Sequence, residues 1–83
     1  MRVKVRAVIK SFALVTFSKY GQKYEGQIHI SEFGRIKQTY ISDLSSVVSV
    51  GNDFDAIVKQ YCKKYRCWEL AINGNEMNCY DGN

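Results

Sequence analysis

The 83-residue chain contains no proline and only one histidine, three cysteines and six glycines. Because proline cannot donate a backbone hydrogen bond, its absence leaves every candidate strand free to pair within a sheet. His29 is accompanied by no positioned nucleophile and no paired carboxylates, so the sequence predicts no catalytic set and no enzyme. The chain also lacks a long apolar run. We therefore expect neither a signal peptide nor a transmembrane helix, and predict a cytoplasmic protein.

The three cysteines are Cys62, Cys67 and Cys79. They cannot all pair with one another, and a reducing compartment keeps them as thiols. Four residues lie between the first two and eleven between the last two, which fits no common zinc spacing, and His29 is distant in sequence. The sequence thus predicts no disulfide scaffold, no metal site and no cofactor.

Charge is distributed unevenly along the chain. Residues 1–41 carry eight Lys or Arg against two Glu, a net charge of +6, whereas residues 42–83 carry four against six acids, a net charge of −2. With 46% hydrophobic and 13% aromatic residues, the composition is that of a folded domain and not of a disordered tail. The basic first half, within a total of +4, favours a polyanionic partner.

Alternating apolar and polar side chains predict five strands. In the first, Val3, Val5, Ala7 and Ile9 share one face, and in the second Ala13, Val15 and Phe17 turn inward while Phe12, Leu14 and Thr16 face outward. In the third, Gly26 opens the strand, Ile28 and Ile30 point one way, and Gln27, His29 and Ser31 point the other. The predicted strands cover residues 2–10, 11–17, 24–32, 54–61 and 67–72.

Two connections have recognisable sequence signals. Tyr20-Gly21 marks a tight loop that joins the second and third strands as an antiparallel pair. Residues 33–50 form a long connection in which Ser42 or Asp43 begins a helical turn. Five short strands with a long excursion between the third and fourth predict an all-β fold, a five-stranded Greek-key OB-fold barrel with a short helical turn between strands three and four. We assign residues 1–72 to this domain and residues 73–83 to a polar, flexible tail.

The segment Glu25-Gly26-Gln27-Ile28-His29-Ile30-Ser31-Glu32 resembles the S1 domain, the RNA-binding OB module named for ribosomal protein S1. The third strand of that family reads Glu-Gly-hydrophobic-hydrophobic-His-Ile-Ser-Glu, and this chain departs from it only at Gln27. Similarity extends to three further segments, so that the resemblance covers residues 3 to about 72. They are Val3 through Phe12-Ala13-Leu14-Val15, Val50-Gly51-Asn52-Asp53-Phe54 and Trp68-Glu69-Leu70-Ala71.

The resemblance implies a single-stranded RNA site on the second and third strands and the adjoining loops. His29 falls on the RNA-contacting histidine of the family, but the two usual aromatic positions fall on Ser11 and Leu14. Phe12 shares a face with Leu14 and is one step away from the usual stacking position. The Asp and Arg of the family fall on Cys62 and on or beside Cys67, where Lys63, Lys64 and Arg66 retain the charge. The predicted RNA-binding residues are Lys10, Phe12, Leu14, His29, Lys63, Lys64, Tyr65 and Arg66.

Simpler interpretations stay open for the same residues. Phe12 can pack beneath the long connection, Tyr65 can be an ordinary loop aromatic, and Lys63-Lys64 can be a solvated turn. We expect Trp68 and Tyr24 to pack in the structure and not to stack on a ligand. The functional prediction is a monomeric RNA-binding module of translation or RNA metabolism, associated with the ribosome. The alternative is an OB-fold module that docks to a ribosomal or RNA-processing protein and has little RNA affinity of its own.

Overall fold

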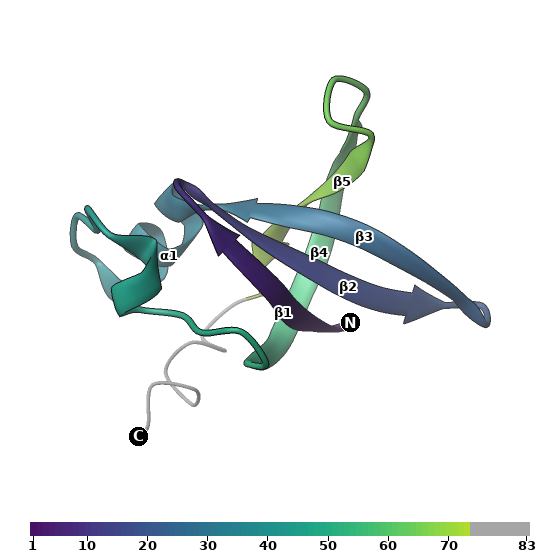
Figure 1. The fold of residues 1–83 in the computed structure, drawn as a ribbon, viewed down its shortest axis with the longest axis horizontal. Coiled ribbons are helices and arrows are strands. Elements are labelled where there is room, and N and C mark those ends of the chain that lie inside the picture. The colour runs from purple at the N-terminus through teal and green to yellow at the C-terminus, as the bar shows by residue number, and fades with distance from the viewer. Residues whose placement is uncertain (74–83) are drawn as a thin grey trace.

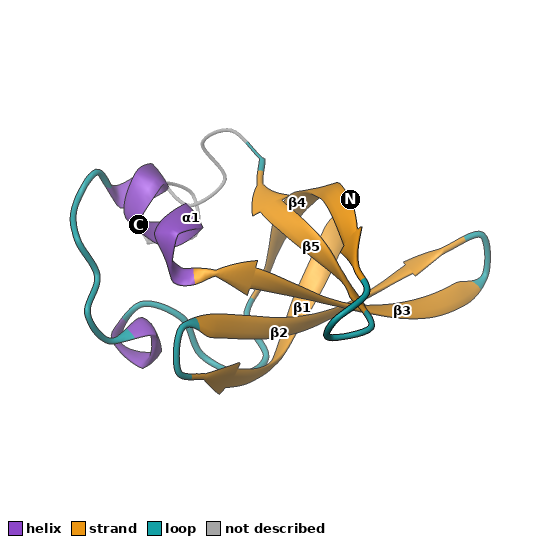
Figure 2. Cartoon of the chain, turned by 90° about the horizontal axis from the view of Figure 1, so that it is seen from above, coloured by secondary structure: helices purple, strands orange, loops and turns teal. Residues whose placement is uncertain are grey.

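The computed structural model describes residues 1–73. Five strands form one closed sheet in the order β1-β2-β3-β5-β4, with a short helix at one end (Figures 1 and 2). The elements are β1 (Arg2–Ile9), β2 (Phe12–Lys19), β3 (Gln22–His29), α1 (Ile30–Lys37), the 3-10 turn η1 (Leu44–Ser46), β4 (Asp53–Cys62) and β5 (Cys67–Ile72). Within the described residues, no helix is long and apolar enough to cross a membrane. The prediction of five strands and a mostly-β fold is confirmed.

The sheet closes through one short parallel contact. All other neighbouring strands are antiparallel, whereas β3 pairs with β5 in parallel, with Gly26 opposite Trp68 and Gln27 opposite Glu69. The predicted hairpin between β2 and β3 is also present. Tyr20 (φ 54°) and Gly21 (φ 75°) both have positive φ, as a two-residue turn compatible with strand twist requires.

The core fills the inside of the closed sheet and the space under α1. From β2, Ala13, Val15 and Phe17 are buried, as predicted. Phe33 of α1 is fully buried and meets Phe54 of β4 edge to face, with 5.9 Å between the ring centroids. The remaining buried hydrophobic side chains are Val3, Val5, Ile28, Ile41, Leu44, Val48, Ala56, Leu70 and Ile72.

The strand predicted through Ile30, Ser31 and Glu32 is wrong, because β3 ends at His29 and these residues form the first turn of α1. The backbone of His29 is still extended, at φ −72° and ψ 149°, and its side chain caps the helix by accepting from the backbone N–H of Ser31. Because His29 is both the last residue of β3 and the N-cap of α1, a period-two pattern does not reveal where the strand ends. The connection therefore holds an eight-residue helix besides the predicted turn.

The helical turn predicted at Ser42 or Asp43 is confirmed. Asp43 is the N-cap of η1, and its carboxylate accepts hydrogen bonds from the backbone N–H and the hydroxyl of Ser45. This cap satisfies a donor that the short turn leaves free.

The prediction that Val3, Val5, Ala7 and Ile9 share one face of β1 is wrong beyond Val5. The register with β2 shifts between Val5 and Ala7, so a bulge interrupts the alternation. As a result Val8 packs against the core, whereas Ile9 is 51% exposed.

Tyr24 and Trp68, which we expect to pack within the fold, both contact other aromatic rings. Tyr24 stacks on Phe17 with 5.5 Å between the ring centroids, as expected. Trp68 is only half-buried: it packs against the core and meets Tyr61 edge to face at 5.0 Å. The predicted tail lies outside the described residues except for Asn73, whose amide donates to the Asp55 carboxylate.

Candidate functional site

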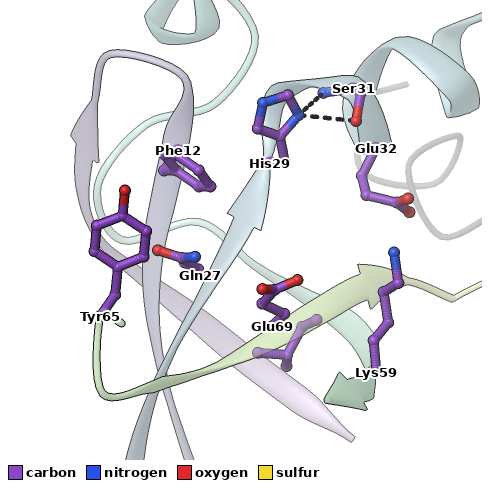
Figure 3. A pocket seen from close by; sticks show the side chains of 9 residues that line it. Phe12, Gln27, His29, Ser31, Glu32, Lys59, Tyr65 and Glu69 are labelled. Carbon is purple, nitrogen blue, oxygen red and sulfur yellow. Dashed lines mark hydrogen bonds between the residues drawn. The ribbon is translucent and has the colours of Figure 1, made fainter. Parts of the chain in front are cut away.

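Three aromatic rings from three parts of the chain gather on the outer face of the sheet (Figure 3). Phe12 of β2 lies directly opposite His29 of β3, and their rings meet edge to face with 5.1 Å between the centroids. Tyr65, in the turn between β4 and β5, brings its ring centroid to 6.4 Å from that of Phe12. The side chain of Phe12 therefore belongs to this outer cluster, and Tyr65 is its third member.

The ring of His29 is fixed by the helix that follows it. Its Nδ1 accepts from the backbone N–H of Ser31 at 3.1 Å and lies 2.9 Å from the Ser31 hydroxyl oxygen (Figure 3). A ring nitrogen that accepts a hydrogen bond carries no proton, so the neutral imidazole holds its proton on Nε2. The site thus contains an oriented N–H donor whose position is set by the cap of α1.

Two clefts adjoin at the aromatic cluster. The first, of about 220 Å³, is lined by Phe12, Gln27, His29, Ser31, Glu32, Lys59, Tyr65, Glu69 and Leu70. The second, of about 320 Å³, is lined by Ile9, Lys10, Ser11, Phe12, Leu14, Gln27 and Tyr65. Because Phe12, Gln27 and Tyr65 line both clefts, we treat the two as one aromatic groove.

The first cleft contains charges of both signs, and its two carboxylates, Glu32 and Glu69, accept different hydrogen bonds from the protein. Glu32 accepts from the guanidinium of Arg35 at 3.0 Å and from the backbone N–H of Ile72 at 3.3 Å, which ties α1 to β5. Within residues 1–73, the side chain of Glu69 accepts one hydrogen bond, from the side chain of Gln60 at 3.3 Å. Glu32 therefore has a structural role, whereas Glu69 retains acceptor capacity toward the cleft.

The structure separates the predicted site residues into two groups. Lys10, Phe12, Leu14, His29 and Tyr65 all line the aromatic groove. Lys63, Lys64 and Arg66 are exposed residues of the β4–β5 turn and line neither cleft. The Lys64 ammonium lies 5.4 Å from the centroid of the Tyr65 ring, so this charge is nevertheless close to the cluster.

The groove also contains residues outside the predicted set, among them Gln27, Lys59 and Glu69. Gln27 shares the period-two face of His29, and that signal was available in the sequence. Lys59 lies at a register shift of β4 between Val58 and Gln60, and Glu69 reaches the groove through the parallel contact of β5 with β3. Neither a bulge nor a non-local strand pairing is visible in the alternation of a single strand.

The groove is not built as a metal centre. In the part of the chain that the structure describes, no cluster of three or more His, Cys, Asp or Glu side chains is placed to hold a metal ion. Its chemistry consists of aromatic faces, the donor on His29, the amide of Gln27, one available carboxylate and lysine ammonium groups.

Cys62 and Cys67 are free thiols that face each other across the base of the β4–β5 turn. Burial raises the pKa of the Cys67 thiol, and the neighbouring Cys62, Glu69 and Glu25 raise the pKa further. A raised pKa lowers the thiolate fraction at neutral pH, and thiolate is the form that reacts.

We therefore expect Cys67 to react with iodoacetamide more slowly than glutathione at neutral pH, with a rate that still rises with pH above the range where glutathione has levelled off. Quantitative mass spectrometry of peptides alkylated over a pH series measures the rate. A Glu69→Gln variant removes one of the charges that raise this pKa, and we expect it to shift the pH profile of the Cys67 alkylation rate to lower pH. A profile that coincides with that of glutathione would contradict the expectation.

Comparison of the sequence with models of known protein families gave no match, and comparison with curated protein sequences gave none.

Proposed function

We propose that this chain is an S1-like OB-fold domain that binds single-stranded RNA in the aromatic groove. The closed five-stranded sheet, the order of its strands and the placement of α1 between β3 and β4 support an OB-type Greek-key barrel. Such barrels bind nucleic acid on the face of strands two and three together with the neighbouring loops, and the groove lies on that part of this sheet.

The observation that carries the proposal is the convergence of Phe12, His29 and Tyr65 on one cleft. Single-stranded nucleic acids are held by aromatic faces on which bases stack, at about 1–3 kcal/mol for each base. Phe12 and Tyr65 supply two such faces from separate elements. The Nε2–H of His29, held by the helix cap, donates to a base or to a ribose hydroxyl.

Cations surround the groove on more than one side. Lys59 lines the first cleft and Lys10 the second, while Lys63, Lys64 and Arg66 lie on the turn that carries Tyr65. Phosphates of a strand that stacks on Phe12 and Tyr65 pass close to these groups, and the resulting attraction is independent of sequence. RNA affinity therefore combines stacking with a salt-sensitive electrostatic contribution.

A titration of fluorescently labelled decauridylate tests the proposal. We expect binding whose Kd rises steeply between about 50 and about 200 mM salt, because binding releases counterions from the RNA and added salt reduces the free energy gained by that release. Phe12→Ala and Tyr65→Ala are each expected to raise Kd about tenfold, the loss of one stacking face. Fluorescence anisotropy gives the Kd values, and circular dichroism verifies that each variant is folded.

Tyr20→Ala is the control for these substitutions. Tyr20 is 90% exposed on the β2–β3 turn and lines neither cleft, so its loss should leave Kd unchanged. Absence of binding at about 50 mM salt would overturn the proposal and leave the protein-docking alternative. If Tyr20→Ala and Phe12→Ala raised Kd equally, the aromatic groove would not be the binding site.

A further inference from the structure

Gln27 is a buried polar side chain that the fold itself does not use. It is 7% exposed, lines both clefts of the aromatic groove and lies between Tyr65 and Glu69 (Figure 3). Among residues 1–73, no group forms a hydrogen bond with its side-chain amide. A buried amide without a partner destabilises a fold, whereas an apolar side chain of similar size would not. A bound ligand can supply the missing partner.

Glu69 lies next to this amide. The parallel pairing of β3 with β5 sets Gln27 opposite Glu69, and both side chains line the first cleft (Figure 3). A carboxylate has two oxygens and about four acceptor positions, of which the hydrogen bond from Gln60 uses one. The pair therefore offers an amide, which both donates and accepts, beside a carboxylate, which only accepts.

The arrangement of donors and acceptors selects among the four bases. Two adjacent oxygens of a carboxylate are best matched by two parallel N–H donors, as in paired hydrogen bonds with a guanidinium. Among unpaired RNA bases, guanine alone presents two neighbouring donors, N1–H and the 2-amino group, beside an acceptor, O6. Adenine and cytosine present one amino group beside a bare ring nitrogen, and the N3–H of uracil lies between two carbonyl oxygens that a carboxylate repels.

From this geometry we infer that Gln27 and Glu69 form a base subsite selective for guanine. Glu69 accepts from N1–H and the 2-amino group, the amide of Gln27 donates to O6, and Phe12 or Tyr65 stacks on the ring. This inference rests on the proposed RNA binding and deepens it, because the aromatic groove alone holds any base. It also accounts for a polar residue where the S1 pattern has a hydrophobic one.

Heptauridylates with one variable central base test the inference. We expect the natural chain to bind the heptamer with central guanine about tenfold more tightly than the all-uridine heptamer, the effect of one good paired contact to a base edge. Inosine lacks the 2-amino group, so a heptamer with central inosine should lose most of this advantage. Gln27→Leu and Glu69→Gln should each bring the preference close to unity while binding to the all-uridine heptamer persists.

Glu25→Gln is the charge-matched control. Glu25 is an exposed residue of β3 that lines neither cleft and pairs with Arg6 at 3.8 Å, so this variant removes the same charge from the same sheet without touching the subsite. The guanine preference should survive it. Thermal unfolding accompanies each titration, and Gln27→Leu is expected to unfold at a higher temperature than the natural chain, since it removes an unpartnered buried amide.

The outcomes separate the inference from the proposal on which it rests. Equal affinity of the natural chain for all heptamers overturns the guanine subsite and leaves RNA binding intact. A guanine preference that persists in both Gln27→Leu and Glu69→Gln overturns the assignment to these residues. Absence of binding to every heptamer overturns the proposed function itself.

Discussion

Replacement of Phe33 by alanine is expected to lower the free energy of unfolding by about 3–5 kcal/mol, the usual cost of removing a buried aromatic side chain. Phe33 is fully buried and meets Phe54 of β4 edge to face at 5.9 Å. It is the only residue of α1 that is fully buried in the described structure, so it fixes the helix against the end of the closed sheet. Small domains are stable by about 5–15 kcal/mol, and this loss removes a large part of that margin.

Chemical denaturation followed by tryptophan fluorescence measures the effect. Tyr40→Ala is the control, because Tyr40 lies in the same connection but is 88% exposed, and its loss should change the free energy of unfolding by less than about 0.5 kcal/mol. A decrease of less than about 1 kcal/mol in the free energy of unfolding for Phe33→Ala would mean that the packing of α1 on the core contributes little to stability.

Loss of the Phe33 side chain should also weaken RNA binding in the aromatic groove. His29 is the last residue of β3 and the N-cap of α1, and its ring is oriented by the first turn of that helix. When α1 is loosened, the Nδ1 bond to Ser31 is loosened with it, and the Nε2 donor is no longer fixed. RNA affinity of the folded fraction should therefore fall along with stability.

The parts of the fold that the sequence predicts are those set by local alternation and turn chemistry. Ala13, Val15 and Phe17 are buried as expected, Tyr20-Gly21 forms the β2–β3 turn, and Asp43 caps a helical turn. Each depends on residues close in the chain: side chains that alternate, a glycine that tolerates positive φ, or a carboxylate two residues from the N–H that it accepts.

The parts that escape prediction depend on features that local alternation does not contain. The bulge after Val5 moves Val8 inward and Ile9 outward, and it shows only in the pairing of β1 with β2. The alternation of the sequence predicts the end of β3 too late, because Ile30 continues the apolar alternation of Ile28, although the backbone turns into α1 after His29.

In the candidate site, too, the sequence predicts the residues that depend on local alternation and misses those that depend on long-range strand pairing. Phe12 and His29 are both predicted site residues on neighbouring strands, and the register of β2 with β3 puts them directly opposite each other. Glu69 enters the groove only because β5 returns beside β3 in parallel, a contact between segments about 40 residues apart, and such a long-range contact cannot be derived from spacing. Gln27 was visible as a polar residue on the face of His29, but its burial follows from that same contact.

The parallel contact itself depends on Gly26, and Gly26→Val is expected to lower the free energy of unfolding by about 3 kcal/mol or more. A Cβ atom at this position would collide with Cδ1 of Leu70 and would lie 3.0 Å from the backbone carbonyl oxygen of Trp68. Leu70 is 2% exposed, and the Trp68 oxygen belongs to the backbone of β5. The substitution therefore forces β5 away from β3 at the place where the sheet closes.

Lys23→Val is the matched control, because it introduces the same β-branched side chain into the same strand at an exposed position. Its effect on the free energy of unfolding should stay within about 0.5 kcal/mol. Urea denaturation of both variants gives the difference, and near-equal values would show that the approach of the two strands at Gly26 is not a constraint on the fold.

The milder Gly26→Ala connects this constraint to the groove. Even a single methyl group at position 26 widens the separation of β3 and β5, and Gln27 and Glu69 are the next pair along that contact. In the folded fraction we expect the preference for a central guanine to fall while binding to the all-uridine heptamer, which depends on Phe12 and Tyr65, is kept. Loss of both in equal measure would mean that Gly26 acts through stability alone and that the spacing of the two strands does not set base choice.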